Sequence, residues 1–261
     1  DVYKRQTLGD DKIASEGCMG MAYVHLNCGR LDEAWKPTEE ALTLSSNGVC
    51  DFMQSLSMEL KGMLLFQTGD LEGGIEVVEE GLRIQKRLKD CEGGGIGLSF
   101  LAQMNFAKGD LKLAREKYAE SLATFEEVGD RPEIARVLCE TGWTELADED
   151  ARAAQNTFRL AVEVYEEVGS PRGTGLALLG LAAVEAAEGR AERAVQIAGA
   201  AQALTERAGV VCDHPMDPGV EERIEALKVT IPTQKLDGLV GKASELSPAA
   251  VLAMVAEPDA N

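Results

Sequence analysis

The chain has 261 residues, 45% of them hydrophobic and 5% aromatic, and its 26 basic and 45 acidic side chains give a formal net charge of −19. This length and hydrophobic content suffice for a buried core, while the charge repels nucleic-acid phosphates and anionic membrane surfaces. We therefore expect no nucleic-acid partner and no membrane partner for this segment. No signal peptide is visible, and the longest apolar run, residues 175–184, is too short to span a bilayer.

The six cysteines form no CxxC pair, and several fall inside helical patterns. Single thiols of this kind are typical of a reducing compartment, where they are buried as small apolar side chains. We therefore expect a cytoplasmic protein.

Residues 1–11 fit no position of the pattern that follows them. We interpret this stretch as a non-native or disordered leader and expect the chain to be a piece of a longer protein. Apolar residues recur at helical spacing from residue 12 onward, which predicts that the fold begins there.

From residue 12 to residue 208 the chain repeats with a period of 40 residues. Gly29, Gly69, Gly109 and Gly189 mark the same turn in different repeats, and Glu149 occupies that position in the fourth. A fixed period in this range indicates a stacked array in which each repeat is one supersecondary unit, here two helices called A and B. Helix A is predicted over 12–28, 51–68, 91–108, 131–147 and 171–188, and helix B over 31–46, 71–89, 111–128, 151–168 and 191–208.

Small residues mark the place where the two helices of each hairpin cross. Helix A has one midway along its length, and helix B has one in its first turn. Side chains this small let two helix axes approach closely, so we predict that they are buried. They are Ala22, Gly62, Ala102, Gly142 and Ala182 in helix A, and Ala34, Gly74, Ala114, Ala154 and Ala194 in helix B.

Capping residues and prolines refine the expected helix ends. Asp130 and Ser170 are good N-cap residues, and the prolines that follow them, Pro132 and Pro171, are tolerated in a first helical turn. Pro37 instead falls inside a predicted helix B. Its missing N–H should kink that helix or delay its start.

The repeat pattern stops after residue 208. Residues 209–219 have a glycine at each end and prolines at 215 and 218, and they read as a linker. Three short helices are predicted beyond it, over 220–230, 233–243 and 248–256. We expect the whole stretch 209–261 to be a linker plus C-terminal capping helices that cover the open apolar face of the last repeat.

The hairpin pattern resembles the tetratricopeptide repeat, with a small residue midway along helix A, Gly-Asp at the turn and alanine five residues later. The 40-residue period exceeds the usual 34 of that repeat. It is similar to the MalT-like arrays in the C-terminal region of bacterial LuxR- and AfsR-type regulators, where an NTPase module precedes the repeats. The resemblance covers residues 12–208 and implies an all-α, right-handed α-solenoid of five helical hairpins. Similar arrays are attached to bacterial protein kinases and nucleotide cyclases.

The polar clusters along the chain indicate no catalytic residue, no metal site and no cofactor site. The glycine-rich stretch 92–97 lacks the Lys-Ser/Thr of a phosphate loop and falls at the start of a predicted helix. His25 is expected to be packed or to face the groove, and His214, beside Cys212 and Asp213, is expected to be an incidental surface residue. The glutamate pairs at 39–40, 79–80, 126–127 and 166–167 are expected on a solvated outer face.

A partner is expected on the concave face, which the A helices line in an array of this type. The position after the small residue of helix A points into that face and recurs once per repeat. Equivalent positions lie side by side in a solenoid, and aromatic or basic anchors dominate many interfaces. The alternative is that these side chains pack between neighbouring A helices. The predicted groove consists of Tyr23, Met63, Gln103 and Trp143, bordered by Glu16, Glu59 and Arg136.

We therefore expect a non-catalytic interaction or sensor module that binds a protein, a peptide or another domain of its parent chain. One alternative is a sensor array for a small inducer molecule, which requires a closed pocket with converging polar groups. Another alternative is the regulatory tail of a protein kinase or nucleotide cyclase.

Overall fold

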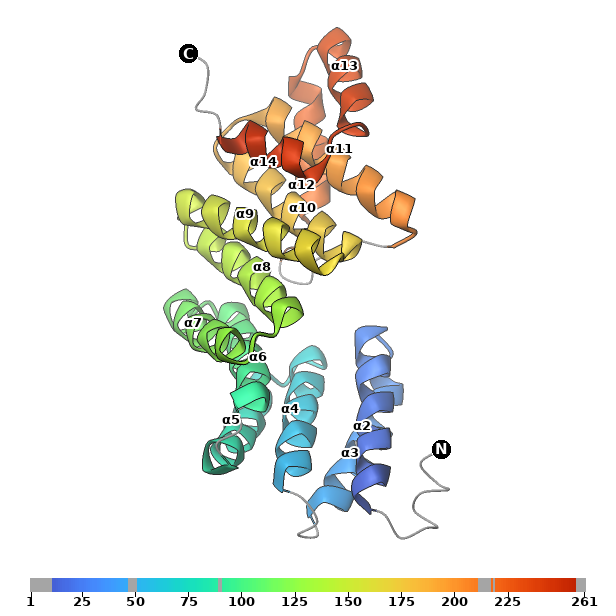
Figure 1. Ribbon diagram of the computed structural model, residues 1–261, viewed down its shortest axis with the longest axis vertical. Coiled ribbons are helices and arrows are strands. Elements are labelled where there is room, and N and C mark those ends of the chain that lie inside the picture. Colours follow the sequence, from blue (N-terminus) through green and yellow to red (C-terminus); the bar gives the residue numbers. More distant parts are fainter. Residues whose placement is uncertain (1–10, 47–50, 89–90, 211–216, 218, 257–261) are drawn as a thin grey trace. The chain divides into compact units, whose positions relative to one another are not determined.

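The computed structural model describes residues 11–46, 51–88, 91–210, 217 and 219–256. All regular secondary structure in these ranges is helical, which confirms the predicted all-α class. Contacts between Cα atoms divide the chain into two compact units, with the boundary between Val128 and Gly129. Within the described ranges, the N-terminal unit consists of three helical hairpins, and the C-terminal unit consists of two hairpins and a helical tail (Figure 1).

The hairpins of the N-terminal unit pack one after another. Helix A of each hairpin packs along its helix B, and helix B contacts helix A of the next hairpin. One buried apolar cluster extends from Ala22 in the first hairpin to Met104 in the third. The hairpins are α2 (Asp11–Asn27) with α3 (Leu31–Ser46), α4 (Asp51–Gln67) with α5 (Leu71–Leu88), and α6 (Cys91–Lys108) with α7 (Leu111–Val128).

The C-terminal unit contains two further hairpins packed in the same way, and a helical tail then packs on the last of them. Its hairpins are α8 (Arg131–Ala147) with α9 (Ala151–Val168), and α10 (Pro171–Ala187) with α11 (Ala191–Ala208). Its tail consists of α12 (Val220–Leu227), the 3-10 helix η1 (Lys228–Thr230), α13 (Thr233–Ala243) and α14 (Pro248–Ala256).

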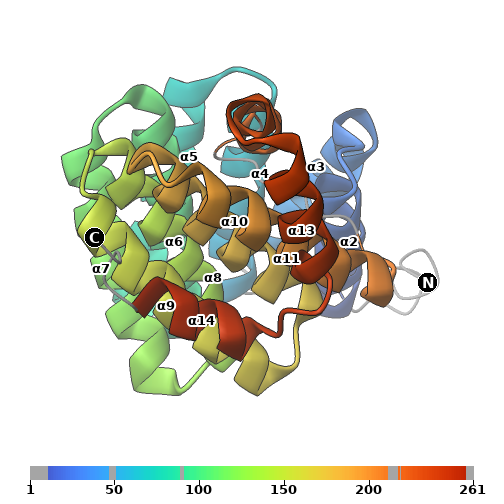
Figure 2. The ribbon, with the colours of Figure 1, turned by 90° about the horizontal axis from the view of Figure 1, so that it is seen from above.

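The tail helices pack on the last hairpin. Helix α12 contacts both α10 and α11, α14 contacts α10, and α13 runs beside α11 (Figures 1 and 2). With α9 and α11 on its other sides, α10 is enclosed, and every residue from Gly173 to Glu185 is buried. Charged residues are correspondingly absent from 173–184 of this helix.

The chain reverses direction through one recurring backbone conformation. A left-handed glycine closes a helix because the N–H groups at and after it bond back to the last carbonyls, as Asp110 N does to Asn105 O at 2.9 Å. Asp110 then caps the next helix, accepting from Leu113 N at 3.1 Å. Glu149 adopts the same conformation with φ 61°, which side chains rarely do. In the described residues the left-handed glycines are Gly29, Gly69, Gly109, Gly129, Gly169, Gly189 and Gly209, all separated by multiples of 20 residues.

The small residues predicted at the hairpin crossings are all buried. In the second hairpin, a Cβ added to Gly62 would lie 2.9 Å from the carbonyl oxygen of Gly74, and one added to Gly74 would lie 2.8 Å from that of Gly62. Helices α4 and α5 are therefore too close for a methyl group at this crossing. In the third hairpin, Ser121 Oγ on α7 donates to the carbonyl oxygen of Gly95 on α6 at 2.7 Å, which adds a polar tie.

The ten repeat helices begin and end within one residue of the expected positions, and the expected α-solenoid of helical hairpins is confirmed. Two details differ from the local expectations. Helix α3 begins at Leu31 and continues through the buried Pro37, so the proline does not delay its start. Residues 220–230 form α12 and a 3-10 turn instead of one α-helix. Leader residues 1–10, His214 and most of the expected linker lie outside the described residues.

Candidate functional site

The predicted groove residues of the N-terminal unit lie at equivalent places on α2, α4 and α6. Helix α2 packs beside α4, and α4 packs beside α6. Tyr23 on α2 is 55% exposed, Met63 on α4 is buried, and Gln103 on α6 is half-buried. Of these three side chains, Tyr23 therefore presents the largest surface for contact with a partner.

The two predicted border residues of this unit also differ. Glu16 is exposed on α2, whereas Glu59 on α4 is buried. Atom Oε1 of Glu59 lies only 2.4 Å from where a Cβ on Gly97 of α6 would be, and its Cγ lies 3.5 Å from the same point on Gly81 of α5. The side chain of Glu59 therefore packs among three helices, in space that the two glycines leave.

In the C-terminal unit, Trp143 is 2% exposed. Its ring meets that of Phe158 edge to face, with centroids 5.3 Å apart and an interplanar angle of 77°. This arrangement corresponds to the packing alternative for Trp143, and an edge-to-face pair stabilises a core beyond its area. Partner contact by Met63, Gln103, Trp143, Glu59 and Arg136 stays a prediction.

Arg136 is half-buried and bonded along its own helix. Its Nε donates to Glu133 Oε2 at 2.8 Å, and its Nη1 donates to Glu140 Oε1 at 2.9 Å. Burial alone would lower the pKa of Arg136, but the Glu140 and Glu133 carboxylates outweigh it and hold the pKa above its ordinary value. The guanidinium is thus held between two carboxylates, which leaves little of its charge for a partner.

Tyr23 belongs to a larger exposed apolar area on α2 that the sequence analysis did not single out. Met21 is 42% exposed and Val24 is 54% exposed. Gly17 and Gly20 lie on the same side by helical spacing, and a Cβ added to Gly20 would meet no atom of the described residues within 4 Å. We call these five residues the α2 surface.

The corresponding area of α10 is buried. Helix α10 lies four periods after α2, so that Gly180 corresponds to Gly20 and Val184 to Val24. A Cβ added to Gly180 would lie 2.3 Å from the ring of Phe158 on α9. The 40-residue period was therefore the signal that could have found the α2 surface, because it relates these exposed residues to a helix–helix contact elsewhere in the chain.

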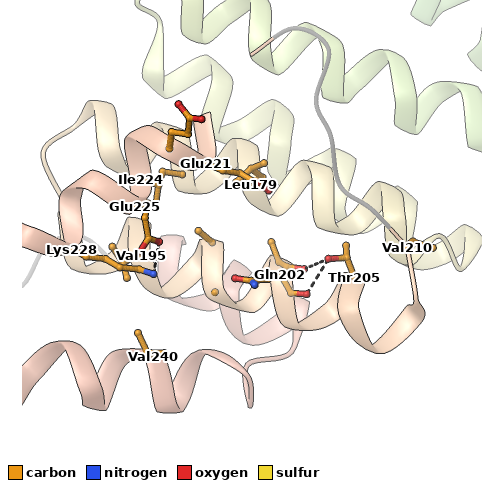
Figure 3. Close-up of a pocket in the computed structure, with 14 residues that line it drawn as sticks. Leu179, Val195, Gln202, Thr205, Val210, Glu221, Ile224, Glu225, Lys228 and Val240 are labelled. Atoms are coloured by element: carbon orange, nitrogen blue, oxygen red, sulfur yellow. Dashed lines mark hydrogen bonds and ion pairs between the residues drawn. The ribbon is translucent and has the colours of Figure 1, made fainter. Parts of the chain in front are cut away.

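A pocket of about 570 Å³ lies in the C-terminal unit beside α11, and tail helices form part of its lining (Figure 3). Its apolar wall includes Leu179, Val195, Ala198, Ile224 and Val240, and its acidic rim consists of Glu221, Glu222 and Glu225. One rim carboxylate is paired, since Lys228 Nζ lies 2.5 Å from Glu225 Oε2. We call this cavity the tail pocket.

A buried ion-pair network ties the tail to the hairpins of the same unit. The carboxylate of Glu185, which is fully buried, accepts hydrogen bonds from Arg190 Nε at 2.6 Å and from Gln155 Nε2 at 3.3 Å. The same Gln155 nitrogen lies 3.3 Å from the carbonyl oxygen of Val255 on α14. The hydrogen bonds to Glu185 raise the pKa of Arg190 above its ordinary value, so its guanidinium stays charged. This network holds α9, α10 and α14 together.

Among the described residues, the other polar groups considered in the sequence analysis form no reactive cluster. In the part of the chain that the structure describes, no three His, Cys, Asp or Glu side chains gather closely enough to bind a metal ion. Residues 92–97 lie inside α6, and the four glutamate pairs are exposed or half-buried. His25 Nδ1 lies 3.4 Å from Glu33 Oε2. Among the described helices, none combines the length and the apolar character needed to traverse a bilayer.

Comparison with protein families matches a tetratricopeptide repeat model to residues 95–167, which run from α6 to α9. This match agrees with the repeat pattern that the sequence resembles. A comparison with curated proteins gives no match.

Solved structures share the fold at low sequence identity. BtubC from P. vanneervenii has a TM-score of 0.62 at 20% identity, covering 88% of this chain and 89% of that one. A putative kinesin light chain with TPR-like repeats from Podosopora anserina has a TM-score of 0.59 at 15% identity, covering 74% and 95%. A signal transduction ATPase with numerous domains and a tetratricopeptide repeat sensor, from Pyrococcus horikoshii, has a TM-score of 0.63 at 14% identity, covering 95% of this chain but 38% of that one. These likenesses establish a solenoid of tetratricopeptide-like hairpins.

Proposed function

We propose that this chain is a non-catalytic interaction or sensor module of a cytoplasmic bacterial signalling or transcriptional regulator, and that it binds a protein or peptide through the α2 surface. The observation that carries the proposal is the exposed apolar area of Met21, Tyr23 and Val24 on one helix of a repeat array. Clustered exposed apolar side chains mark interaction sites, whereas scattered ones do not. The sensor role draws support from the likeness to a signalling ATPase whose repeats are its sensor.

The negative charge of the chain indicates which kind of partner the α2 surface favours. The chain carries a formal net charge of −19, and Glu16 lies two helical turns from Tyr23 on the same side of α2. An acidic surface around an apolar centre favours a partner with basic residues at its rim, mainly through the rate of association.

Site-specific photo-crosslinking tests this proposal. A photoreactive residue is placed at position 23 and, as a control, at position 229 in the 3-10 helix η1, where Val229 is 89% exposed. The captured partner is identified and purified, and its Kd is measured for the wild type and for Tyr23→Ala. We expect capture from position 23 alone, and an affinity about tenfold weaker for Tyr23→Ala at unchanged helix content. Equal affinities for variant and wild type would remove the α2 surface from the function.

The tail pocket favours a second candidate function, the sensing of a small molecule. Its volume of about 570 Å³ falls within the range of ligand pockets, roughly 300–1,000 Å³. An apolar wall below an acidic rim suits an amine with an alkyl chain. Octylamine and octanoate form a matched pair of probes that differ in the sign of their charge. Of the two probes, we expect only octylamine to raise the Tm of the protein. The substitution Ala198→Phe fills the cavity and should abolish that rise. Equal changes in Tm with octylamine and octanoate would rule this function out.

A further inference from the structure

We propose that α13 is a strap over the tail pocket, and that it closes on the alkyl chain of a bound primary amine. This inference rests on the second candidate function, the sensing of a small molecule, because it says how the tail pocket holds such a ligand. Three features of α13 support it: its place in the repeat, its partial packing on α11, and the way in which its two ends are held.

Helices α12 and α13 occupy the sequence positions of a sixth hairpin, although the residue pattern of the repeat ends before them. The span of α11, 191–208, becomes 231–248 when it is moved forward by one 40-residue period, and this range contains α13. In each of the five hairpins, helix B packs along its own helix A. Helix α13 packs along α11 instead, and the tail pocket lies where α11, α12 and α13 meet. The pocket is therefore space that a regular contact between α12 and α13 would fill.

The apolar side of α13 is turned toward α11 but is only partly covered. By helical spacing this side consists of Leu236, Leu239, Val240 and Ala243. The structure describes all 11 residues of α13, and Ala243 is the one that is buried. Val240 points toward α11 (Figure 3) and is still 50% exposed, while both leucines are half-buried. A ligand that enters beside them can therefore bury more of this apolar side.

Small residues on α11 explain why the apolar side of α13 stays partly exposed. Ala198 and Gly199 line the tail pocket together with Val240, and both are half-buried. Protein interiors are close-packed, so a gap between small residues on one helix and branched residues on the other is a place for further apolar atoms. An alkyl chain supplies these atoms, and the acidic rim of the tail pocket favours a positively charged head group.

Two contacts hold the ends of α13 on α11. Near its start, Lys235 Nζ lies 2.6 Å from Glu192 Oε1, and this pair is weak because both side chains are exposed. At its end, Ala243 packs over Gly199, where an added Cβ would lie 2.8 Å from the Cβ of Ala243. Val240 lies between the two contacts. The ends of the helix are thus held while its middle is able to move toward a ligand.

Two glycines make α13 easier to deform. A Cβ added to Gly238 or to Gly241 would meet no atom of the described residues within 4 Å, so packing does not require glycine at either position. Each glycine weakens the helix relative to alanine, and a helix as short as α13 is only marginally stable without tertiary contacts. A ligand that adds contacts should therefore order α13.

Hydrogen exchange of residues 233–243 in the full chain tests the strap. In the free protein we expect α13 to exchange faster than the enclosed α10. Saturating octylamine should slow exchange in α13 by at least about tenfold. Ethylamine has the same charge without the long chain, and it should slow this exchange by less than about twofold. Protection of α13 in the free protein equal to that of α10 would show a pocket that is already closed, and would overturn the inference.

Two leucine variants of α13 form a matched pair. Ala243→Leu pushes the end of α13 away from Gly199 and leaves the lining residues of the tail pocket unchanged, whereas Gly238→Leu adds the same side chain where there is open space. Isothermal titration calorimetry gives the Kd of octylamine, and circular dichroism checks the helix content. We expect Ala243→Leu to weaken binding by about tenfold or more and Gly238→Leu to change it by less than about twofold.

A third variant removes a contact without disturbing the fold. Lys235→Gln breaks an exposed ion pair, and it should weaken octylamine binding by about two- to threefold. Equal Kd values for the wild type and all three variants would overturn the proposal. Equal weakening by Gly238→Leu and Ala243→Leu would also overturn it, because binding would then depend on the stability of α13 and not on its contact with α11.

The remaining outcomes separate the strap from the sensing function. Octylamine could bind saturably, with binding abolished by Ala198→Phe, while exchange of α13 stays unchanged. In that case α13 is a fixed wall, so the strap inference fails and the sensing function stands. If octylamine shows no saturable binding, both fail.

Discussion

Helices α2 and α10 occupy the same place in the repeat, yet one exposes what the other buries. Helix α10 is contacted by α8, α9 and α11 and by α12 and α14 of the tail, and its Gly180 receives the Phe158 ring. In α2, a Cβ added to Gly20 would meet no atom of the described residues within 4 Å, and Val24 is 54% exposed. The comparison teaches that a glycine or valine at a given repeat position has no fixed role, because the neighbouring helix decides whether it is core or surface.

The residues that flank this face are more polar on α2, where the face is exposed, than on α10, where it is buried. Where α10 has Leu176 and Ala183, α2 has Glu16 and Tyr23. A face that is always buried tolerates apolar and small residues throughout, whereas a face that meets water needs polar atoms at its edges. Helix α2 therefore carries an apolar centre with a polar border, which is the composition of a recognition surface.

The largest expected effect separates the two predicted aromatic anchors. Trp143→Ala removes a buried ring that packs on Phe158, so we expect the free energy of unfolding to fall by about 3–5 kcal/mol. Tyr23→Ala removes an exposed ring and should change it by less than about 0.5 kcal/mol. Urea titrations followed by circular dichroism measure both. A stability loss of the same size in both variants would break the comparison.

A leucine at equivalent glycines tests the comparison directly. Gly180→Leu forces a side chain into the Phe158 ring and should cost about 1–3 kcal/mol of stability, or more if the ring cannot move. Gly20→Leu adds a good helix former at an open site and should stabilise by up to about 1 kcal/mol. The two changes in unfolding midpoint should therefore have opposite signs, and equal losses would mean that Gly20 is covered.

A smaller effect tests how the tail covers α10. Gln155→Ala removes the amide that joins Glu185 to the Val255 carbonyl, and should cost about 1 kcal/mol. Hydrogen exchange should rise in α14 more than in α13. Gln202→Ala, on the exposed side of α11, serves as the control and should leave exchange in α14 unchanged. Unaltered exchange of α14 in Gln155→Ala would show that the tail is held by its apolar contacts alone.

The smallest effect, absent at neutral pH, compares the thiol of Cys18 inside α2 with that of Cys28 in the turn after α2. Burial and the nearby Glu40 carboxylate raise the pKa of the Cys18 thiol from its ordinary value of 9.0 to about 11, whereas Cys28 is exposed. A raised folded-state pKa stabilises the fold below the unfolded-state pKa, and this contribution is lost as the pH rises through the folded-state value. We expect the free energy of unfolding to fall between pH 9 and pH 11 in the wild type, and less steeply in Cys18→Ala. At pH 8, iodoacetamide should modify Cys28 well before Cys18, and equal rates would show that Cys18 is accessible.

Most of the fold followed from local sequence rules. The turn glycines and the 40-residue period place every repeat helix, and small residues such as Ala114 mark the crossings because only close-packed helices need them. A tail that covers the last repeat was expected, but no local pattern says that α12 and α14 pack on α10 in particular. Pro37 does not delay the start of α3, because tertiary packing overrides the cost of the proline.

The candidate site was less predictable, because it depends on residues of neighbouring helices. Glu59 occupies a repeat position at which Ser99, Cys139 and Leu179 are also buried, and Gly97 on the next helix A leaves the space into which its side chain packs. Met21 and Val24 have the spacing of core residues, which alone gives no reason to expect them at the surface, whereas the 40-residue period aligns them with Leu181 and Val184 on α10. Only a comparison of facing residues, such as Phe158 with Gly180, reveals what a helix face needs.

Because the turns are separated by multiples of 20 residues, a 40-residue segment with two helices can be inserted or deleted without changing the turns. Removing residues 70–109 joins α4 to α7 through the same left-handed glycine, and brings Gly62 opposite Ala114, another small pair. The turns would accept any order of hairpins. The faces between hairpins would not, since α9 placed before α4 would drive Phe158 into Leu60. The number of repeats is thus free to change in whole hairpins, while their order is fixed by the matching of large and small residues between them.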